Sequence, residues 1–199
     1  MKREESCPEN LLAALKNYRP WNEQEAKDRD EIIRQIKHSP DIFTRENCSA
    51  HMTASSWIVN REHTKVLMVY HNIYDSWSWT GGHADGETDL LSVALREAKE
   101  ETGIHSVRPL SEEIYSLEIL TVDGHMKHGK FVSSHLHLNL TYLLEADEAD
   151  HLQRKPDENS DAAWFGLEEA VNASSEPWFR KWIYPKLNQK LQAFESKDR

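Results

Sequence analysis

The chain has 199 residues, of which 34 are Asp or Glu and 24 are Lys or Arg, so its formal net charge is −10. This charge argues against binding to a nucleic acid duplex or an anionic membrane, although a phosphorylated small molecule could still meet a locally positive or metal-holding site. Two cysteines, Cys7 and Cys48, are too few for a disulfide framework, and no segment has the apolar length of a signal-peptide core or a membrane span, so we expect a cytoplasmic protein.

Residues 8–39 have the pattern of two helices. Pro8 suits a first helical position, and Asn22 followed by Glu25 has the spacing of a capping box. Each helix carries an apolar stripe too narrow to be stable alone, so it must pack on the same chain or on a partner. We predict an N-terminal helical extension over residues 1–45 and expect it to form a homodimer contact.

Residues 46–199 alternate between strand and helix patterns and are predicted to form one α/β domain. Two β-rich segments, 51–60 and 65–71, are separated by a polar turn, which is the pattern of a hairpin. A glycine-rich loop at 77–87 then leads into a helix at 88–102. This order predicts a sheet that is covered by a central helix.

The second half of this domain continues the alternation. Strands are predicted at 107–121 and 134–145, and a short strand at 162–167 follows a polar loop. Two closing helices are predicted at 168–173 and 176–194. Strands on both sides of a central helix, with helices at both ends of the chain, predict a mixed sheet between helical layers.

The central helix carries three glutamates on one face. Glu97, Glu100 and Glu101 are spaced i, i+3 and i+4, which places them within an arc of about 100°. Like charges at i,i+4 destabilise an isolated helix by roughly 0.2–0.5 kcal/mol a pair. A solvated helix face is one interpretation, since Arg96 and Lys99 could pair with them. The neighbouring glycine-rich loop favours another, a Mg²⁺ or Mn²⁺ site for phosphate chemistry, because clustered carboxylates suit hard cations.

The segment 81–104, GGHADGETDLLSVALREAKEETGI, resembles the signature of the Nudix hydrolases, a family that includes MutT-like proteins. The family pattern is G-x5-E-x7-R-E-U-x-E-E-x-G-U, where U is a bulky aliphatic residue. Ala98 occupies one U position as a small substitute. The first Glu of the pattern falls at Thr88, whereas this chain has a glutamate one position earlier, at Glu87. The matching residues are Gly82, Arg96, Glu97, Glu100, Glu101, Gly103 and Ile104.

The resemblance implies a Nudix-type α/β/α sandwich that cleaves a pyrophosphate bond in a nucleoside diphosphate-linked compound, using Mg²⁺ or Mn²⁺. It implies that Glu97, Glu100 and Glu101 bind the metal and that the carbonyl of Gly81 or Gly82 joins them. Arg96 would orient a glutamate, Glu97, through a charge-assisted pair. The small phosphorylated substrate remains open among ADP-ribose, dinucleotide polyphosphates, oxidised nucleoside triphosphates, coenzyme A and sugar nucleotides.

The general base varies within the family, between a glutamate of the helix and one in a distant loop. In the helix, the resemblance makes Glu97 and Glu100 the candidates. In the loop before the short strand, Glu158 lies where many relatives carry an acidic residue near the metals. A solvated loop carboxylate is the alternative interpretation of Glu158.

Several other polar residues are candidates for the site. His83 and Asp85 lie in the glycine-rich loop, where they could contact substrate phosphate or metal or could cap the loop. Glu87 of the same loop is a candidate substrate contact. His135 and His137 alternate along a predicted strand and therefore face one side of it. A zinc ion would need further ligands, and the sequence indicates no partner for this pair. We interpret these two as surface or cleft-lining histidines.

Two other functions fit the same resemblance. A non-catalytic Nudix module could sense nucleotides, but such modules often lose glutamates of the signature, and this chain retains the three in the helix. An isopentenyl diphosphate isomerase would need a catalytic cysteine directly before the Gly-His pair, where this chain has Gly81. The sequence therefore favours the hydrolase.

Overall fold

The computed structural model describes residues 8–127, 129–153 and 159–197. The chain forms two compact units, and strands β1 and β9 run through both of them. The first unit comprises Met1–Ser55, Gly81–Ala94 and Glu112–Tyr142, and the second comprises Ser56–Thr80, Leu95–Ser111 and Leu143–Arg199. Among the described residues, no helix is both long enough and apolar enough to cross a membrane.

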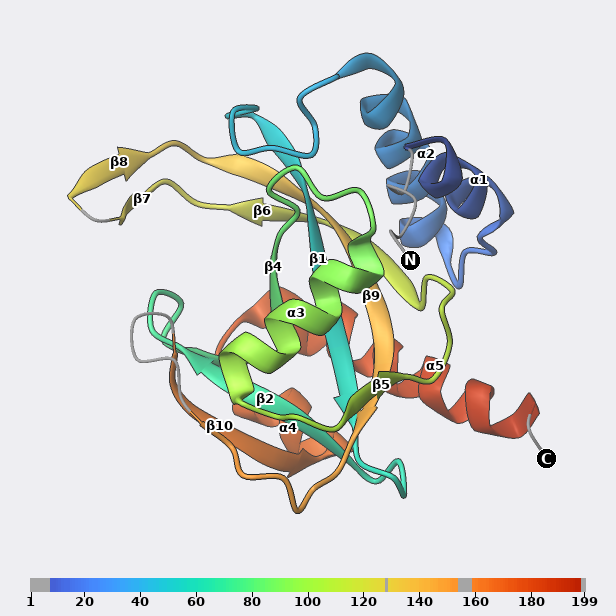
Figure 1. Cartoon of the computed structure of the whole chain (residues 1–199), viewed down its shortest axis with the longest axis vertical. Coiled ribbons are helices and arrows are strands. Elements are labelled where there is room, and N and C mark those ends of the chain that lie inside the picture. The colour runs from blue at the N-terminus through green and yellow to red at the C-terminus, as the bar shows by residue number, and fades with distance from the viewer. Residues whose placement is uncertain (1–7, 128, 154–158, 198–199) are drawn as a thin grey trace, which may run out of the picture. The chain divides into compact units, whose positions relative to one another are not determined.

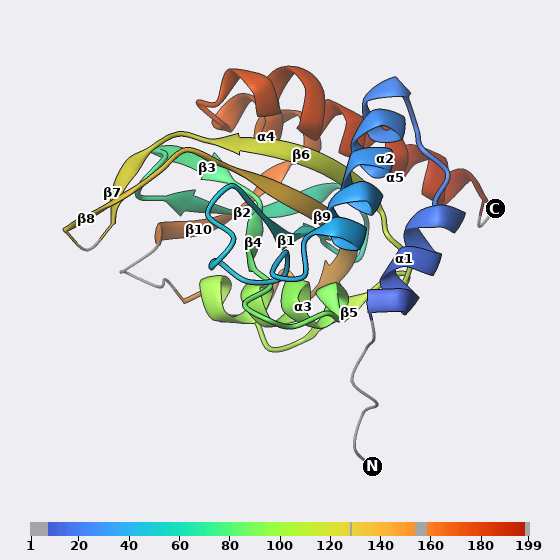
Figure 2. The ribbon, with the colours of Figure 1, turned by 90° about the horizontal axis from the view of Figure 1, so that it is seen from above.

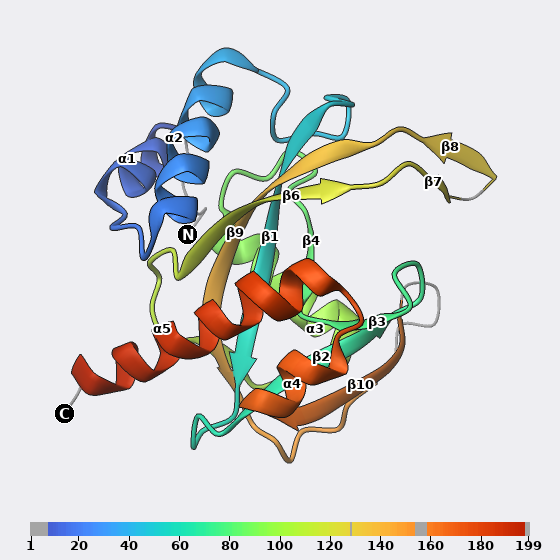
Figure 3. The ribbon, with the colours of Figure 1, turned by 180° about the vertical axis from the view of Figure 1, so that it is seen from behind.

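The first unit begins with the predicted pair of helices, α1 (Pro8–Asn17) and α2 (Glu23–His38). Asn22 is the N-cap of α2, and its side chain accepts a hydrogen bond from the backbone of Glu25, as predicted. The apolar stripes of both helices are buried, and α2 contacts strand β6 (Ser116–Val122) of the same unit (Figure 3). The stripes therefore find their cover within the chain. The buried side chains are Leu11, Leu15, Ile32 and Ile36.

The strands of the first unit combine both directions of pairing. β6 pairs antiparallel with β9, from Ser116 opposite Thr141 to Val122 opposite His135. β1 and β9 run in the same direction, because Leu136 contacts Ser49 and the later Asn139 contacts the later Ser55. The sheet is therefore mixed. The strands are β1 (Ala50–Val59), β4 (Thr80–His83), β6, β9 (His135–Ala146) and, as a two-stranded ribbon, β7 (His125–Lys127) and β8 (Lys130–Val132) (Figure 1).

The second unit contains the predicted hairpin. β1 and β2 pair antiparallel with Ile58 opposite Leu67, and β10 covers the other edge of β2. The strand order of the sheet is β10-β2-β1-β9-β5, with β3 paired to β2, β4 to β1 and β6 to β9. The strands not yet given bounds are β2 (Lys65–His71), β3 (Ser76–Ser78), β5 (Val107–Pro109) and β10 (Asn159–Gly166).

Helices cover both faces of the sheet in the second unit. The second half of α3 (Leu90–Thr102) lies on one face, and α4 (Leu167–Ala173) and α5 (Tyr184–Lys197) lie on the other (Figure 2). A π-helical turn, Phe179–Ile183, precedes α5. The core on the α5 side is aromatic, since Trp57 stacks on Tyr184 with ring centroids 5.2 Å apart. The predicted α/β/α sandwich with an N-terminal helical segment is confirmed.

The glycine-rich stretch at 77–87 was predicted as a loop, and that prediction is partly wrong. Residues 76–78 and 80–83 are strands β3 and β4. For β4 the reason lies at Gly81, where a Cβ atom would be 2.5 Å from Ser55 Oγ and 2.7 Å from Ala54 O. Only a residue without a side chain lets β4 approach β1 this closely.

Candidate active site

The helix of the Nudix-like signature, α3, has well-formed ends. At its start, Asp89 Oδ1 accepts a hydrogen bond from the Ser92 backbone at 3.2 Å. At its end, Gly103 has a φ of +73° and donates its N–H to the Lys99 carbonyl at 2.9 Å. This is the left-handed residue expected after the last turn, where glycine is favoured. The segment R-E-x-x-E-E is therefore held in a regular helix.

Arg96 lies against two of the three predicted metal ligands. Its guanidinium is 2.9 Å from Glu97 Oε1 and 3.9 Å from Glu100 Oε1. The shorter contact is a charge-assisted hydrogen bond that restricts the Glu97 carboxylate. The predicted contact between Arg96 and Glu97 is thus present in the second unit, and the orienting role assigned to it stays a prediction.

The three glutamates differ strongly in exposure. The Glu100 side chain is 48% exposed and that of Glu97 is 13% exposed, whereas Glu101 is buried at 4%. The Glu101 carbonyl accepts a hydrogen bond from the Asn159 amide, which ties the end of α3 to β10. A buried carboxylate is costly unless a cation or hydrogen bonds compensate it. Oxygen donors of this kind fit a hard divalent cation such as Mg²⁺ or Mn²⁺.

The predicted loop residues of the first unit have local partners. Asp85 forms a two-point ion pair with Arg45, at 2.7 and 2.8 Å. Glu87 Oε1 accepts the backbone N–H groups of Thr88 and Asp89, at 2.8 and 2.9 Å. Glu87 therefore caps the chain just before α3. Substrate contacts by Asp85 and Glu87 stay predictions.

Gly82 and Glu158 are the two remaining predicted site residues. Gly82 lies in β4 of the first unit and is half-buried. Its proposed role as a carbonyl ligand stays a prediction. Glu158, the candidate loop base, lies outside the described residues. The role of Glu158 as general base therefore stays a prediction from the sequence.

Four histidines of the first unit gather into one cluster, which we call the histidine cluster: His51, His83, His135 and His137. Their potential ligand atoms all lie within 4.8 Å of one another, and ring centroids of neighbouring pairs are 4.8–5.1 Å apart. Among the described residues, the histidine cluster is the group of three or more His, Cys, Asp or Glu side chains whose ligand atoms lie close enough together to hold one metal ion. The interpretation of His135 and His137 as a pair without partners is wrong.

The histidine cluster is largely shielded from water. His51 is buried at 4%, and the other three members are half-buried. Burial lowers the pKa of His137 to about 2, with the nearby His83 ring as the next contribution. Burial also lowers the pKa of His51. Both imidazoles are therefore neutral at pH 7.

Position 81 argues against the isomerase alternative. The space beside Gly81 is occupied by Ser55 Oγ and the Ala54 carbonyl, which are 2.5 and 2.7 Å from a Cβ placed there. A cysteine could not occupy this position unless β1 or β4 moved. The described cysteine, Cys48, is exposed and lies before β1. The packing at Gly81 thus agrees with the sequence, which has glycine where an isomerase would need a catalytic cysteine.

Comparison with known proteins is consistent with these observations. A model of the NUDIX domain matches residues 50–187, which is more than half of the chain. No curated protein sequence matches. Similar solved structures include an Ap4A hydrolase from C. elegans, which is 21% identical, with coverage of 73% of this chain and 98% of that one and a TM-score of 0.54. A NUDIX-family hydrolase from Clostridium perfringens is 22% identical, with coverage of 72% and 97% and a TM-score of 0.49.

A mutator MutT protein from Bacillus halodurans is also similar, with 21% identity, coverage of 69% of this chain and 81% of that one, and a TM-score of 0.45. At these identities the structural matches support the fold alone. The fold assignment rests on the C. elegans protein, whose TM-score is 0.54. The family follows from the domain match together with the R-E-x-x-E-E helix. The chain belongs to the Nudix family, and it is a Nudix hydrolase.

Proposed function

We propose that the chain cleaves a pyrophosphate bond in a nucleoside diphosphate-linked compound and depends on Mg²⁺ or Mn²⁺ bound by Glu97, Glu100 and Glu101. The observation that carries this proposal is the second half of α3. There Arg96 contacts Glu97 and Glu100, while Glu101 is a buried carboxylate. A bound divalent cation would polarise the pyrophosphate and lower the pKa of a bound water.

The two more accessible glutamates would have different roles. Glu97 is restricted by its 2.9 Å contact with Arg96, which suits a ligand that must keep one orientation. The Glu100 side chain is 48% exposed and its contact with Arg96 is longer, at 3.9 Å, so water can reach its carboxylate, which suits a group that accepts a proton from an attacking water. We therefore assign Glu100 as the base candidate in the helix, with Glu158 as the candidate in the loop.

The experiment is a panel of substrates with each metal. It would contain ADP-ribose, Ap4A, an oxidised nucleoside triphosphate, coenzyme A and a sugar nucleotide. Ap4A is included because the C. elegans protein of the same fold is an Ap4A hydrolase. Released phosphate and product masses would identify the bond that is cleaved. Tight binding of a panel compound without turnover, under both metals, would instead support the nucleotide-sensing alternative.

We expect Mg²⁺ or Mn²⁺ to raise the melting temperature of the folded chain. A cation relieves the repulsion on α3 only in the native state, so its binding stabilises that state by mass action. At a concentration 100-fold above Kd the gain would be about 2.7 kcal/mol. Thermal melts would be recorded after treatment with EDTA and again after addition of excess metal. An unchanged melting temperature at millimolar metal would favour the solvated interpretation of the three glutamates.

A further inference from the structure

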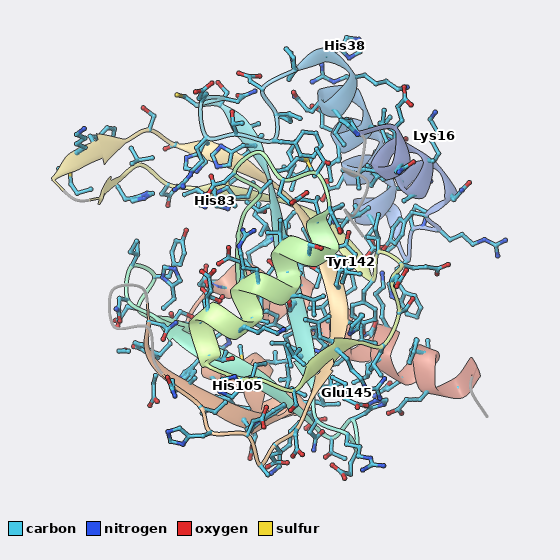
Figure 4. The ribbon with its side chains drawn as sticks, viewed as in Figure 1. Lys16, His38, His83, His105, Tyr142 and Glu145 are labelled. Atoms are coloured by element: carbon cyan, nitrogen blue, oxygen red, sulfur yellow. The ribbon has the colours of Figure 1, made fainter. Side chains whose placement is uncertain are left out.

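The proposed hydrolysis does not account for the histidine cluster, and the substrate contact predicted for His83 stays a prediction. Its members come from three strands of the first unit: His51 from β1, His83 from β4, and His135 and His137 from β9. Figure 4 labels His83 at this cluster and shows His38 of the same unit away from it, at the end of α2. Four histidines from three different strands require a shared explanation, because local sequence does not bring them together.

Hydrogen bonds orient two of the rings in the same way. His51 Nδ1 is 3.1 Å from the Asn47 carbonyl, and His135 Nδ1 is 2.8 Å from the Ser133 carbonyl. A carbonyl oxygen only accepts, so the Nδ1 that faces it carries a proton, and Nε2 is the nitrogen whose lone pair can bind a metal ion. This is the arrangement of metal-binding histidines, whose second nitrogen donates to a backbone carbonyl.

The Nε2 atoms of these rings carry lone pairs that a cation could accept. His51 Nε2 is buried and has no hydrogen-bond partner among the described residues. His135 Nε2 lies 3.2 Å from His137 Nε2. A buried polar atom without a partner is costly, and a metal ion would satisfy it together with the neighbouring lone pairs. An ordinary cluster of hydrogen-bonded histidines does not account for the buried His51 nitrogen.

We propose that the histidine cluster is a binding site for a single late transition-metal ion, of which Zn²⁺ is the best fit. Imidazole nitrogens suit zinc, copper and nickel, whereas Mg²⁺ prefers oxygen. Zn–N distances of about 2.0–2.1 Å place two nitrogens of a tetrahedral site roughly 3.3–3.4 Å apart. The 3.2 Å between His135 Nε2 and His137 Nε2 is close to that separation. The other nitrogens, up to 4.8 Å apart, would have to come closer by rotation of the rings.

Such an ion would connect the strand of the glycine pair to its neighbours. His83 directly follows Gly82 in β4, and its fellow ligands lie in β1 and β9. Four protein ligands complete a tetrahedral site, which is the number found in structural zinc sites, whereas catalytic sites have three and an open position. The ion would therefore stabilise the first unit and fix the end of β4. This inference does not depend on the hydrolase reaction.

The test measures metal binding directly. Full-length protein without an affinity tag would be stripped with a chelator and titrated with Zn²⁺ against a chromophoric competitor, in excess Mg²⁺. We expect one Zn²⁺ per chain. His135→Gln and His137→Gln should each weaken binding by at least about 100-fold, since loss of a mere outer-shell partner already costs 10–100-fold. His38→Gln, which changes an exposed histidine outside the cluster, should bind as the wild type does.

Two further measurements keep the outcome decisive. If circular dichroism shows that either cluster variant is unfolded, the wild type is loaded with Co²⁺ and its visible absorption spectrum is recorded. Strong bands, typical of tetrahedral nitrogen coordination, would support the site. A weak spectrum, typical of octahedral coordination, would overturn it. Glu101→Gln should retain Zn²⁺ binding, which separates this inference from the proposed hydrolysis. Absence of Zn²⁺ uptake by the wild type, or equal affinity in the cluster variants and His38→Gln, would also overturn it.

Discussion

Glu101→Gln is expected to lower kcat on the best substrate of the panel by at least about 100-fold, the scale of a lost catalytic group. The substitution keeps the shape of the side chain and removes one negative charge from the proposed metal site. Glu101 is the glutamate for which the effect should be clearest, because it is buried at 4% and bulk solvent cannot replace its charge. The measurement is steady-state kinetics over a range of Mg²⁺ and Mn²⁺ concentrations.

Glu168→Gln is the matched control for this experiment. Glu168 lies in the first turn of α4, in the same unit, and is exposed, so its loss should leave kcat within twofold. A melt of each variant would separate a lost metal ligand from a damaged fold. Glu101→Gln should stay folded and lose most of its stabilisation by Mg²⁺. Equal turnover by Glu101→Gln and the wild type would show that Glu101 is not a metal ligand.

The elements with strong local signals could be predicted from the sequence. Helix α3 follows from its apolar periodicity and from Gly103, whose positive φ ends it as expected. The β1–β2 hairpin follows from two β-rich runs around a polar turn, and Asn22 was identified as a cap from its spacing to Glu25. In each case the residues that decide the structure lie within a few positions of one another.

The features that were missed depend on contacts distant in sequence. His135 and His137 lie two positions apart on the same face of β9. His51 and His83 join them only because β1 lies beside β9 and β4 pairs with β1. Nothing in the local pattern specifies that register. The strand β4 was missed for a related reason, since Gly81 permits a close approach to a partner 26 residues earlier, Ser55. Glycine in a loop and glycine beneath a neighbouring strand have the same local sequence.

Glu25 shows the same limit in the N-terminal helices, where its spacing predicted a capping residue. Its carboxylate is instead fully buried, with an exposed fraction of 0%. It accepts hydrogen bonds from the Tyr18 hydroxyl at 2.6 Å, the Trp21 backbone at 2.7 Å and the Ser116 hydroxyl at 2.9 Å. Burial, and next the nearby Glu25 charge, raises the pKa of Tyr18 well above its usual value. Glu25 therefore joins α2 to β6 through Ser116.

Glu25→Ala is expected to lower the free energy of unfolding by about 3 kcal/mol, because removal of a buried acceptor leaves its donors unsatisfied at about 1–3 kcal/mol each. Ser116 would keep a partner, since its hydroxyl also lies 2.5 Å from Glu118 Oε1. The loss then falls on the Trp21 N–H and on the Tyr18 hydroxyl, whose second acceptor, the Tyr115 carbonyl, is more distant at 3.4 Å. For a chain of this size the melting temperature should fall by roughly 6–12 °C. Denaturant unfolding and thermal melts would measure both quantities.

Glu23→Ala provides the control, because Glu23 begins the same helix but is exposed. Its effect should stay within about 0.5 kcal/mol, as for most surface substitutions. Hydrogen exchange in α1 and α2 should accelerate in Glu25→Ala and not in Glu23→Ala, since only the first variant loses the connection to β6. Equal stability of the two variants would mean that water replaces the lost carboxylate. The apolar contacts of Leu15 and Ile32, both at 0% exposure, would then be what holds the helices to the first unit.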